Sequence, residues 1–198
     1  RWLTANGVIG LYPANTVEDD AIVLYADEAR TTELMRWHPL RMQSERPVVD
    51  GVKRPPNPAA KLQECWREVY AEVRRHVAGP LAIGGKSMGG RMASLLADEL
   101  GADALVCLGY PFYAVGKPEK PRVEHLAGLK TRTLIVQGER DALGNRAAVE
   151  GYDLSPSIEV MWLVAGDHDL KPLKASGFSH AQHLEAAAGK VAGFLGAR

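Results

Sequence analysis

The sequence predicts an α/β fold in which helices cover both faces of a parallel sheet. From about residue 58 onward, short apolar runs alternate with stretches whose apolar residues recur at helical spacing, a pattern typical of such sheets. One apolar run leads directly into the sequence Gly85-Lys-Ser-Met-Gly89, which a helix-forming stretch follows. The first fifty residues lack this alternation and predict a separate segment.

The N-terminal segment predicts a β-hairpin followed by a helix. Two strand-like runs within residues 8–25 are joined by a polar stretch, and a helix is expected over about 31–44. Residues 45–59 contain four prolines, which favours a linker over a regular element. We therefore expect two units, residues 1–51 and residues 52–198.

The second unit is expected to contain three helices and four strands. Its strand-like runs are continuously apolar, as in strands that are buried on both faces. Gly101 follows the second helix at the position where glycine commonly ends a helix. The expected elements, in order, are a helix ending near Gly79, a strand at 81–84, a helix ending at Leu100, strands at 104–109, 133–137 and 158–164, and a final helix with Leu184, Ala188, Val191 and Leu195 on the face that covers the sheet.

The composition argues against a nucleic-acid or membrane partner. Lysine plus arginine and aspartate plus glutamate number 24 each, so the chain has no net charge that would attract phosphate groups. No apolar run approaches the roughly 20 residues of a membrane span, and no signal segment opens the chain. Cys65 and Cys107 lack the spacing of a metal site, so we expect reduced thiols, no bound metal and a cytoplasmic protein.

Three residues follow three different predicted strands in the chain order serine, aspartate, histidine. Ser87 lies in the Gly-x-Ser-x-Gly sequence, and Asp141 and His168 each come after a later strand. Because the carboxyl ends of parallel strands meet at one edge of a sheet, we expect these side chains to lie close together. We expect Ser87 to attack a carbonyl carbon, His168 to act as the general base and Asp141 to orient the imidazole.

The backbone N–H of Met88 is expected to stabilise the negative charge that develops on the attacked oxygen. A second N–H usually comes from a loop that often begins His-Gly, and the chain contains no His-Gly. The turn at Ala14-Asn15 could substitute. Gly85-Lys-Ser87 also looks like the end of a phosphate-binding loop, but Pro80 stands where that motif requires glycine. No nucleotide or other cofactor is therefore expected.

Several other polar or aromatic residues leave alternatives open. Asp167 and Asp169 flank the predicted base and could compete for the acid's role, although surface-turn positions are favoured for both. His180 and His183 could share a metal ion, but a solvated helix face is favoured because no third ligand is evident. The segment 110–112 fits either a cleft lining or ordinary core packing.

Six segments after residue 51 carry a family resemblance. They are Lys53-Arg-Pro-Pro56, Gly84-Gly-Lys-Ser-Met-Gly-Gly-Arg-Met-Ala93, Leu108-Gly-Tyr-Pro-Phe112, Gly116-Lys-Pro-Glu119, Leu134-Ile-Val-Gln-Gly-Glu-Arg-Asp141 and Gly166-Asp-His168. With them, this part of the chain resembles a family of small α/β-hydrolases related in fold to dienelactone hydrolases. The resemblance implies the same triad. It also implies an α/β-hydrolase fold that lacks its usual N-terminal strands, which should precede residue 53.

The first fifty-one residues resemble a different family. Trp2-Leu-Thr-Ala-Asn-Gly-Val-Ile-Gly-Leu-Tyr-Pro-Ala-Asn15 and Arg46-Pro-Val-Val-Asp-Gly51 are similar to part of the activation domain of cobalamin-dependent methionine synthase. The segment of that domain that binds S-adenosylmethionine, an Arg-Pro-Ala-x-Gly-Tyr-Pro stretch, is absent, so no cofactor site is carried over. A fusion, a recombined reading frame or a deliberate chimera would each explain why two different resemblances meet near residue 51.

These observations favour a serine hydrolase that cleaves an ester, thioester or amide of a small-molecule acyl substrate, as a carboxylesterase does. Because the segment that should supply the oxyanion loop resembles another family, we expect the activity to be impaired. Two alternatives stay open. One is a catalytically weak α/β-hydrolase scaffold that binds a protein partner, and the other is a fragment of the methionine synthase activation domain.

Overall fold

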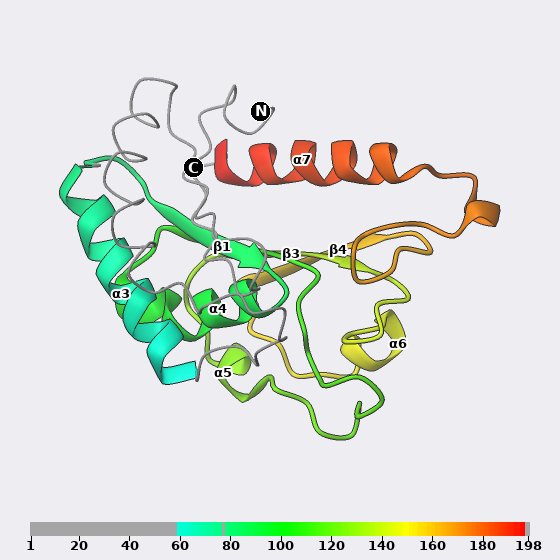
Figure 1. Ribbon diagram of the computed structural model, residues 1–198, viewed down its shortest axis with the longest axis horizontal. Helices are drawn as coiled ribbons and strands as arrows, with labels where there is room; N and C mark the ends of the chain where they lie inside the picture. Colours follow the sequence, from blue (N-terminus) through cyan, green and yellow to red (C-terminus); the bar gives the residue numbers. More distant parts are fainter. Residues whose placement is uncertain (1–58, 77, 197–198) are drawn as a thin grey trace, which may run out of the picture.

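The computed structural model describes residues 59–76 and 78–196. The predicted hairpin, the helix at 31–44 and the proline-rich linker lie outside these residues and stay predictions. The described elements, in chain order, are α3 (Ala59–His76), β1 (Ala82–Lys86), α4 (Met88–Leu100), β2 (Ala104–Leu108), α5 (Glu124–Ala127), β3 (Thr133–Gly138), α6 (Arg146–Val149), β4 (Ile158–Leu163), the 3₁₀ helix η1 (Lys174–Ser176) and α7 (His180–Gly196) (Figure 1).

The four described strands form one parallel sheet in the order β1-β2-β3-β4, which confirms the predicted fold class. β1 continues beyond the predicted end at residue 84 because Gly85 and Lys86 pair with Cys107 and Leu108 of β2. Every strand points the same way, so the loops that follow them emerge at the same edge of the sheet.

Helices cover both faces of this sheet, with α3 and α4 on one face and α7 on the other (Figure 1). In β3, Ile135 packs into the core that α3 and α4 form, whereas Leu134 and Val136 pack into the core that α7 forms. Successive side chains of a strand point to opposite faces, and both faces are covered here. The strands are continuously apolar for this reason.

The helices α3 and α4 follow their predicted patterns closely. α3 buries Trp66, Val69, Tyr70 and Val73, which recur at the predicted helical spacing. α4 ends at Leu100, and Gly101 adopts the left-handed conformation (φ 61°) that closes the helix.

The C-terminal helix α7 covers the sheet as predicted, and the predicted residues Val191 and Leu195 lie against the core, but other predicted positions do not. Leu184 was expected on the covered face and is 48% exposed. The Nδ1–H of His183 donates instead to the carbonyl oxygen of Leu170 at 2.9 Å, which allows the histidine to be buried. Apolar spacing therefore predicted the burial of Val191 correctly and that of Leu184 wrongly. The buried residues of α7 are His183, Ala187, Val191 and Phe194.

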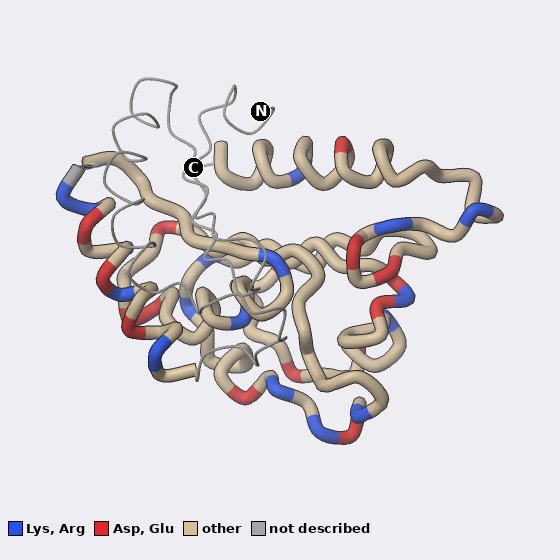
Figure 2. The backbone as a smooth tube through the Cα atoms, in the orientation of Figure 1, with Lys and Arg blue, Asp and Glu red and all other residues tan. Residues whose placement is uncertain are grey.

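Acidic and basic residues are interspersed along α3 and the loops, whereas α7 carries few of either sign (Figure 2). Within the described residues, no helix has the length and apolar character needed to cross a membrane. The same residues contain no group of three side chains placed to hold a metal ion. Apart from α7, the described part of the chain therefore carries both signs of charge side by side.

β1 and α4 approach each other too closely at Gly90 to leave room for a side chain. A Cβ atom added there would lie 2.7 Å from the carbonyl oxygen of Gly85 and 3.2 Å from the Cβ of Cys107. This contact sets the helix directly onto the end of the strand. The short turn between them holds Ser87 in place.

We expect Gly90→Ala to destabilise the fold, because the added methyl group would push α4 away from β1. The loss should be about 2 kcal/mol of unfolding free energy, measured by urea denaturation. Gly189→Ala in α7 is the control, since no described atom lies within 4 Å of its added Cβ. It should raise the unfolding free energy by about 0.5 to 1 kcal/mol. Unchanged stability of the Gly90→Ala protein would contradict the close contact.

Candidate active site

Ser87 lies in the tight turn between β1 and α4. Its backbone has φ 51° and ψ −122°, a combination that non-glycine residues rarely adopt. The Ser87 N–H donates to the carbonyl oxygen of Leu108 at 2.9 Å, which ties the turn to the end of β2. The residue is half-buried. The strained turn therefore presents the hydroxyl group at the carboxyl edge of the sheet.

The imidazole of His168 joins the three predicted site residues. Its Nε2 lies 2.9 Å from Oγ of Ser87, and its Nδ1 lies 2.8 Å from Oδ2 of Asp141. A carboxylate can only accept, so Nδ1–H donates to Asp141 and Nε2 is left to accept from the serine hydroxyl. Side chains from the loops after β1, β3 and β4 thus form one hydrogen-bonded chain.

The carboxylate of Asp141 is fully buried and accepts hydrogen bonds from three groups. Besides His168, the Nε2 amide of Gln137 donates to Oδ2 at 2.9 Å and the Leu143 N–H donates to Oδ1 at 2.8 Å. A buried charge needs such donors because it has lost its water. They also fix the direction from which Asp141 approaches the imidazole.

Gln137 is a site residue that the sequence analysis missed. It is fully buried, and its Oε1 accepts from the Tyr110 N–H at 2.6 Å while its Nε2 reaches Asp141. The sequence feature that could have indicated this role is the amide of Gln137 directly after the apolar run 134–136. Because a buried amide requires hydrogen-bond partners, that position could have been singled out.

The turn that carries Asp141 also holds the loop that carries the histidine. Oε2 of Glu139 accepts from the Ala165 N–H, and Nε of Arg140 donates to the Ala165 carbonyl oxygen, both at 2.9 Å. Ala165 itself has a left-handed backbone (φ 52°), which these two contacts help to hold. The hydrogen bond from Ala165 lowers the pKa of Glu139, and Arg146 adds to the effect. Hydrogen bonds therefore link the turn that carries Asp141 to the loop that carries His168.

The aspartates that flank His168 do not contact its ring nitrogens. Oδ1 of Asp167 accepts from the N–H groups of Asp169 and Lys171, which closes the turn after the histidine. The carboxylate of Asp169 forms an ion pair with Lys86 at 2.5 Å. The carboxylate that contacts the imidazole is that of Asp141, so neither flanking aspartate takes the acid's role.

The loop after β2 leaves room for the histidine loop. Gly109 has φ 60°, and a Cβ atom there would lie 2.6 Å from the carbonyl oxygen of His168. Only glycine fits both constraints. The following Tyr110 and Phe112 are fully buried, so core packing accounts for the segment 110–112.

The N–H of Met88 opens α4 directly after Ser87. No described residue accepts a hydrogen bond from this N–H, and the Ser87 side chain does not cap the helix. The first N–H groups of a helix favour negative charge. The predicted second donor, at Ala14-Asn15, lies outside the described residues.

A second serine–histidine pair lies inside the protein. Oγ of Ser94 is 2.9 Å from Nε2 of His125 and 2.9 Å from the hydroxyl of Tyr110. Ser94 is only 2% exposed, and burial lowers the pKa of His125. Among the described residues, no carboxylate hydrogen-bonds this imidazole. The cluster ties α4 to α5 and is closed to a substrate.

The two histidines of α7 do not face solvent together as the sequence favoured. His183 is buried against Leu170, and Nε2–H of His180 donates to the carbonyl oxygen of Asp169 at 3.0 Å. Both side chains hold the segment that follows the predicted base. Sequence spacing did not indicate this role, because the contacted backbone lies in another loop.

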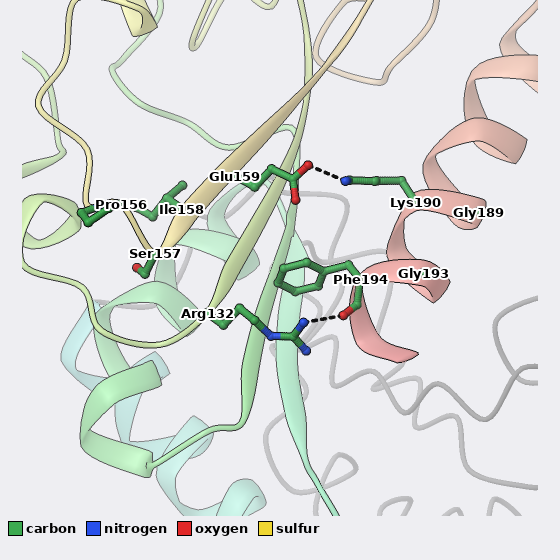
Figure 3. Close-up of a pocket in the computed structure, with 9 residues that line it drawn as sticks. All are labelled: Arg132, Pro156, Ser157, Ile158, Glu159, Gly189, Lys190, Gly193 and Phe194. Atoms are coloured by element: carbon green, nitrogen blue, oxygen red, sulfur yellow. Dashed lines mark hydrogen bonds and ion pairs between the residues drawn. The ribbon is translucent and has the colours of Figure 1, made fainter. Parts of the chain in front are cut away.

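A hollow of about 470 Å³ lies between α7 and the sheet, and Arg132, Ile158, Glu159 and Lys190 are among its lining residues (Figure 3). Ile158 begins β4 and Arg132 immediately precedes β3. The hollow is therefore at the amino end of these strands, whereas Ser87 follows the carboxyl end of β1. It is separate from the candidate site.

Solved structures with a similar fold include three bacterial proteins. An alpha-beta serine hydrolase homologue from Coxiella burnetii shows 18% identity and a TM-score of 0.50, over 74% of this chain and 64% of that chain. A Xanthomonas campestris protein assigned to the alpha/beta hydrolase superfamily shows 18% identity and a TM-score of 0.51, over 71% and 70%. Est1E from Butyrivibrio proteoclasticus, solved with ferulic acid bound, shows 14% identity and a TM-score of 0.50, over 71% and 70%.

These similarities establish the fold, and the chain spans less than two thirds of the Coxiella protein. The predicted boundary at residue 51 and the methionine synthase resemblance of residues 1–51 stay predictions. A family model described as an alpha/beta hydrolase domain matches residues 28–196, which is most of the chain. The protein therefore belongs to the α/β-hydrolase family.

Proposed function

We propose that this protein is a serine hydrolase that cleaves an ester, thioester or amide of a small acyl substrate, as a carboxylesterase does. The hydrogen-bonded chain from Ser87 through His168 to Asp141, with links of 2.9 and 2.8 Å, carries the proposal. Membership of the α/β-hydrolase family supports a hydrolase. Within that family, we propose a relation to the dienelactone hydrolases.

The proposed reaction has two halves. Ser87 Oγ attacks the substrate carbonyl carbon while Nε2 of His168 takes the hydroxyl proton, and the imidazolium then gives that proton to the leaving group. Water then enters and loses a proton to the same nitrogen while its oxygen attacks the acyl carbon. The bond from that carbon to Ser87 Oγ breaks, and the imidazolium returns the proton to Ser87, which releases the carboxylic acid and restores the enzyme. Asp141 keeps Nδ1 protonated and stabilises the imidazolium in both halves.

The oxyanion formed in each half would receive a hydrogen bond from the Met88 N–H. The sequence predicts that the loop for a second donor would precede α3, in the segment that resembles another family. We propose that this segment supplies no equivalent donor. Losing one donor typically slows kcat by about 10²- to 10³-fold. We therefore propose that the enzyme turns over its substrate slowly.

We also propose a small-molecule substrate and a cytoplasmic location. The interspersed charges in Figure 2 support a small acyl compound over a nucleic acid. The location rests on Cys65 and Cys107, for which the sequence predicts reduced thiols.

Ser87→Ala should abolish turnover of short p-nitrophenyl esters, lowering kcat by at least about 10³-fold, because the acyl group would have no nucleophile. Ser94→Ala is the matched control, since Ser94 also contacts a histidine but is buried. It should keep kcat within about threefold while losing about 1 kcal/mol of stability through its lost hydrogen bonds. Steady-state kinetics and thermal unfolding provide the two readouts. Equal turnover by Ser87→Ala and the original protein would refute the proposal.

Asp141→Asn should lower kcat by about 10³- to 10⁴-fold, because an amide does not hold the imidazole in the required tautomer. Asp153→Asn, on an exposed loop, makes the same chemical change away from the site and should have no effect. Circular dichroism of both variants checks that the fold is retained. If a folded Asp141→Asn protein kept its original kcat, another carboxylate would have to orient His168.

A further inference from the structure

An ion pair links the strand that carries the nucleophile to the loop that carries the base. Nζ of Lys86 donates to Oδ1 of Asp169 at 2.5 Å. Lys86 immediately precedes Ser87, and Asp169 immediately follows His168. The pair therefore spans the two loops whose side chains meet in the Ser87–His168 hydrogen bond.

The pair places two opposite charges on the residues next to Ser87 and His168 in the sequence. Asp169 would otherwise be a second carboxylate near His168, in addition to Asp141. A carboxylate near a histidine stabilises its protonated form, which is unable to act as a base. Among the described residues, the charged or titratable groups around His168 are Asp141 after β3, Lys86 at the end of β1, Asp167 and Asp169 on its own loop, and His180 at the start of α7.

We propose that Lys86 and Asp169 form a positioning pair, in which the lysine neutralises Asp169 and holds the histidine loop against β1. Asp141 is then the carboxylate that governs the charge of His168. This inference rests on the proposed function and assigns to the site two residues that do not touch the reacting atoms.

The charges around Asp169 support the neutralising role of Lys86. The Lys86 ammonium lowers the pKa of Asp169 through its hydrogen bond and charge, and positive charge on His168 and His180 acts in the same direction. The Asp169 side chain is 70% exposed and that of Lys86 is 34% exposed, so solvent keeps the effect modest.

The test is an NMR titration of the His168 ring protons in the full chain, with the signal assigned from His168→Asn. Lys86→Met leaves Asp169 unneutralised and should raise the titration midpoint by about 0.5 pH unit. Asp169→Asn leaves the lysine unneutralised and should lower the midpoint by about the same amount. The double variant should return close to the original midpoint. Lys86→Arg, which keeps the charge, should behave as the original protein does.

The ion pair between Lys190 and Glu159 provides the matched control (Figure 3). It is similarly exposed but lies beside the hollow at the amino end of β4, so neutralising either residue should leave the midpoint unchanged. Repeating the titrations in a His180→Gln background removes the second histidine near Asp169. Opposite shifts that persist there support the proposal.

Shifts of the same sign, or midpoints unchanged in both single variants, would overturn the positioning pair. If Lys86→Met fails to fold, Asp169→Asn at the more exposed partner still decides the sign. The titration needs no turnover, so its outcome is independent of the esterase assay. Opposite shifts without esterase activity would refute the proposed function alone, whereas activity without shifts would refute this inference alone.

Discussion

The two hydrogen bonds of the His168 imidazole determine how the rest of the site is arranged. They require side chains from the loops after β1, β3 and β4 to meet at one ring, and only parallel strands that end at a common edge allow this. β2 lies between β1 and β3 and contributes no side chain to the hydrogen-bonded chain. Its contribution is Gly109, which lets the histidine backbone pass close to the strand end.

Most of the polar residues near the site hold loops in place. Gln137 donates a hydrogen bond to the buried Asp141 carboxylate. Glu139 accepts from the Ala165 N–H, and Arg140 donates to the Ala165 carbonyl oxygen. The end of β3 and the turn after it thus orient Asp141 and hold the loop that carries His168. This arrangement explains the run of polar residues directly after an apolar strand, because every one of them has a partner that the fold brings to it.

The sequence predicted the parallel sheet and the two side chains that meet at the His168 ring, because continuous apolar runs and the Gly-x-Ser-x-Gly turn are local patterns. It did not predict the burial of His183 in α7 or the role of Gln137. Both depend on partners distant in sequence, since His183 is buried through a hydrogen bond to Leu170 and Gln137 by contact with Tyr110. Apolar spacing counts a histidine or a glutamine as polar and carries no information about such partners.

We propose that the site activates Ser87, and not Ser94, as a nucleophile. Labelling of the native full chain with a fluorophosphonate, followed by peptide mass spectrometry, tests it most directly. We predict one adduct per chain, located on Ser87, and no adduct in the His168→Asn variant. An adduct on Ser94, or an unlabelled Ser87 in a chain that unfolds cooperatively, would contradict the claim, and the second result would favour a catalytically weak scaffold.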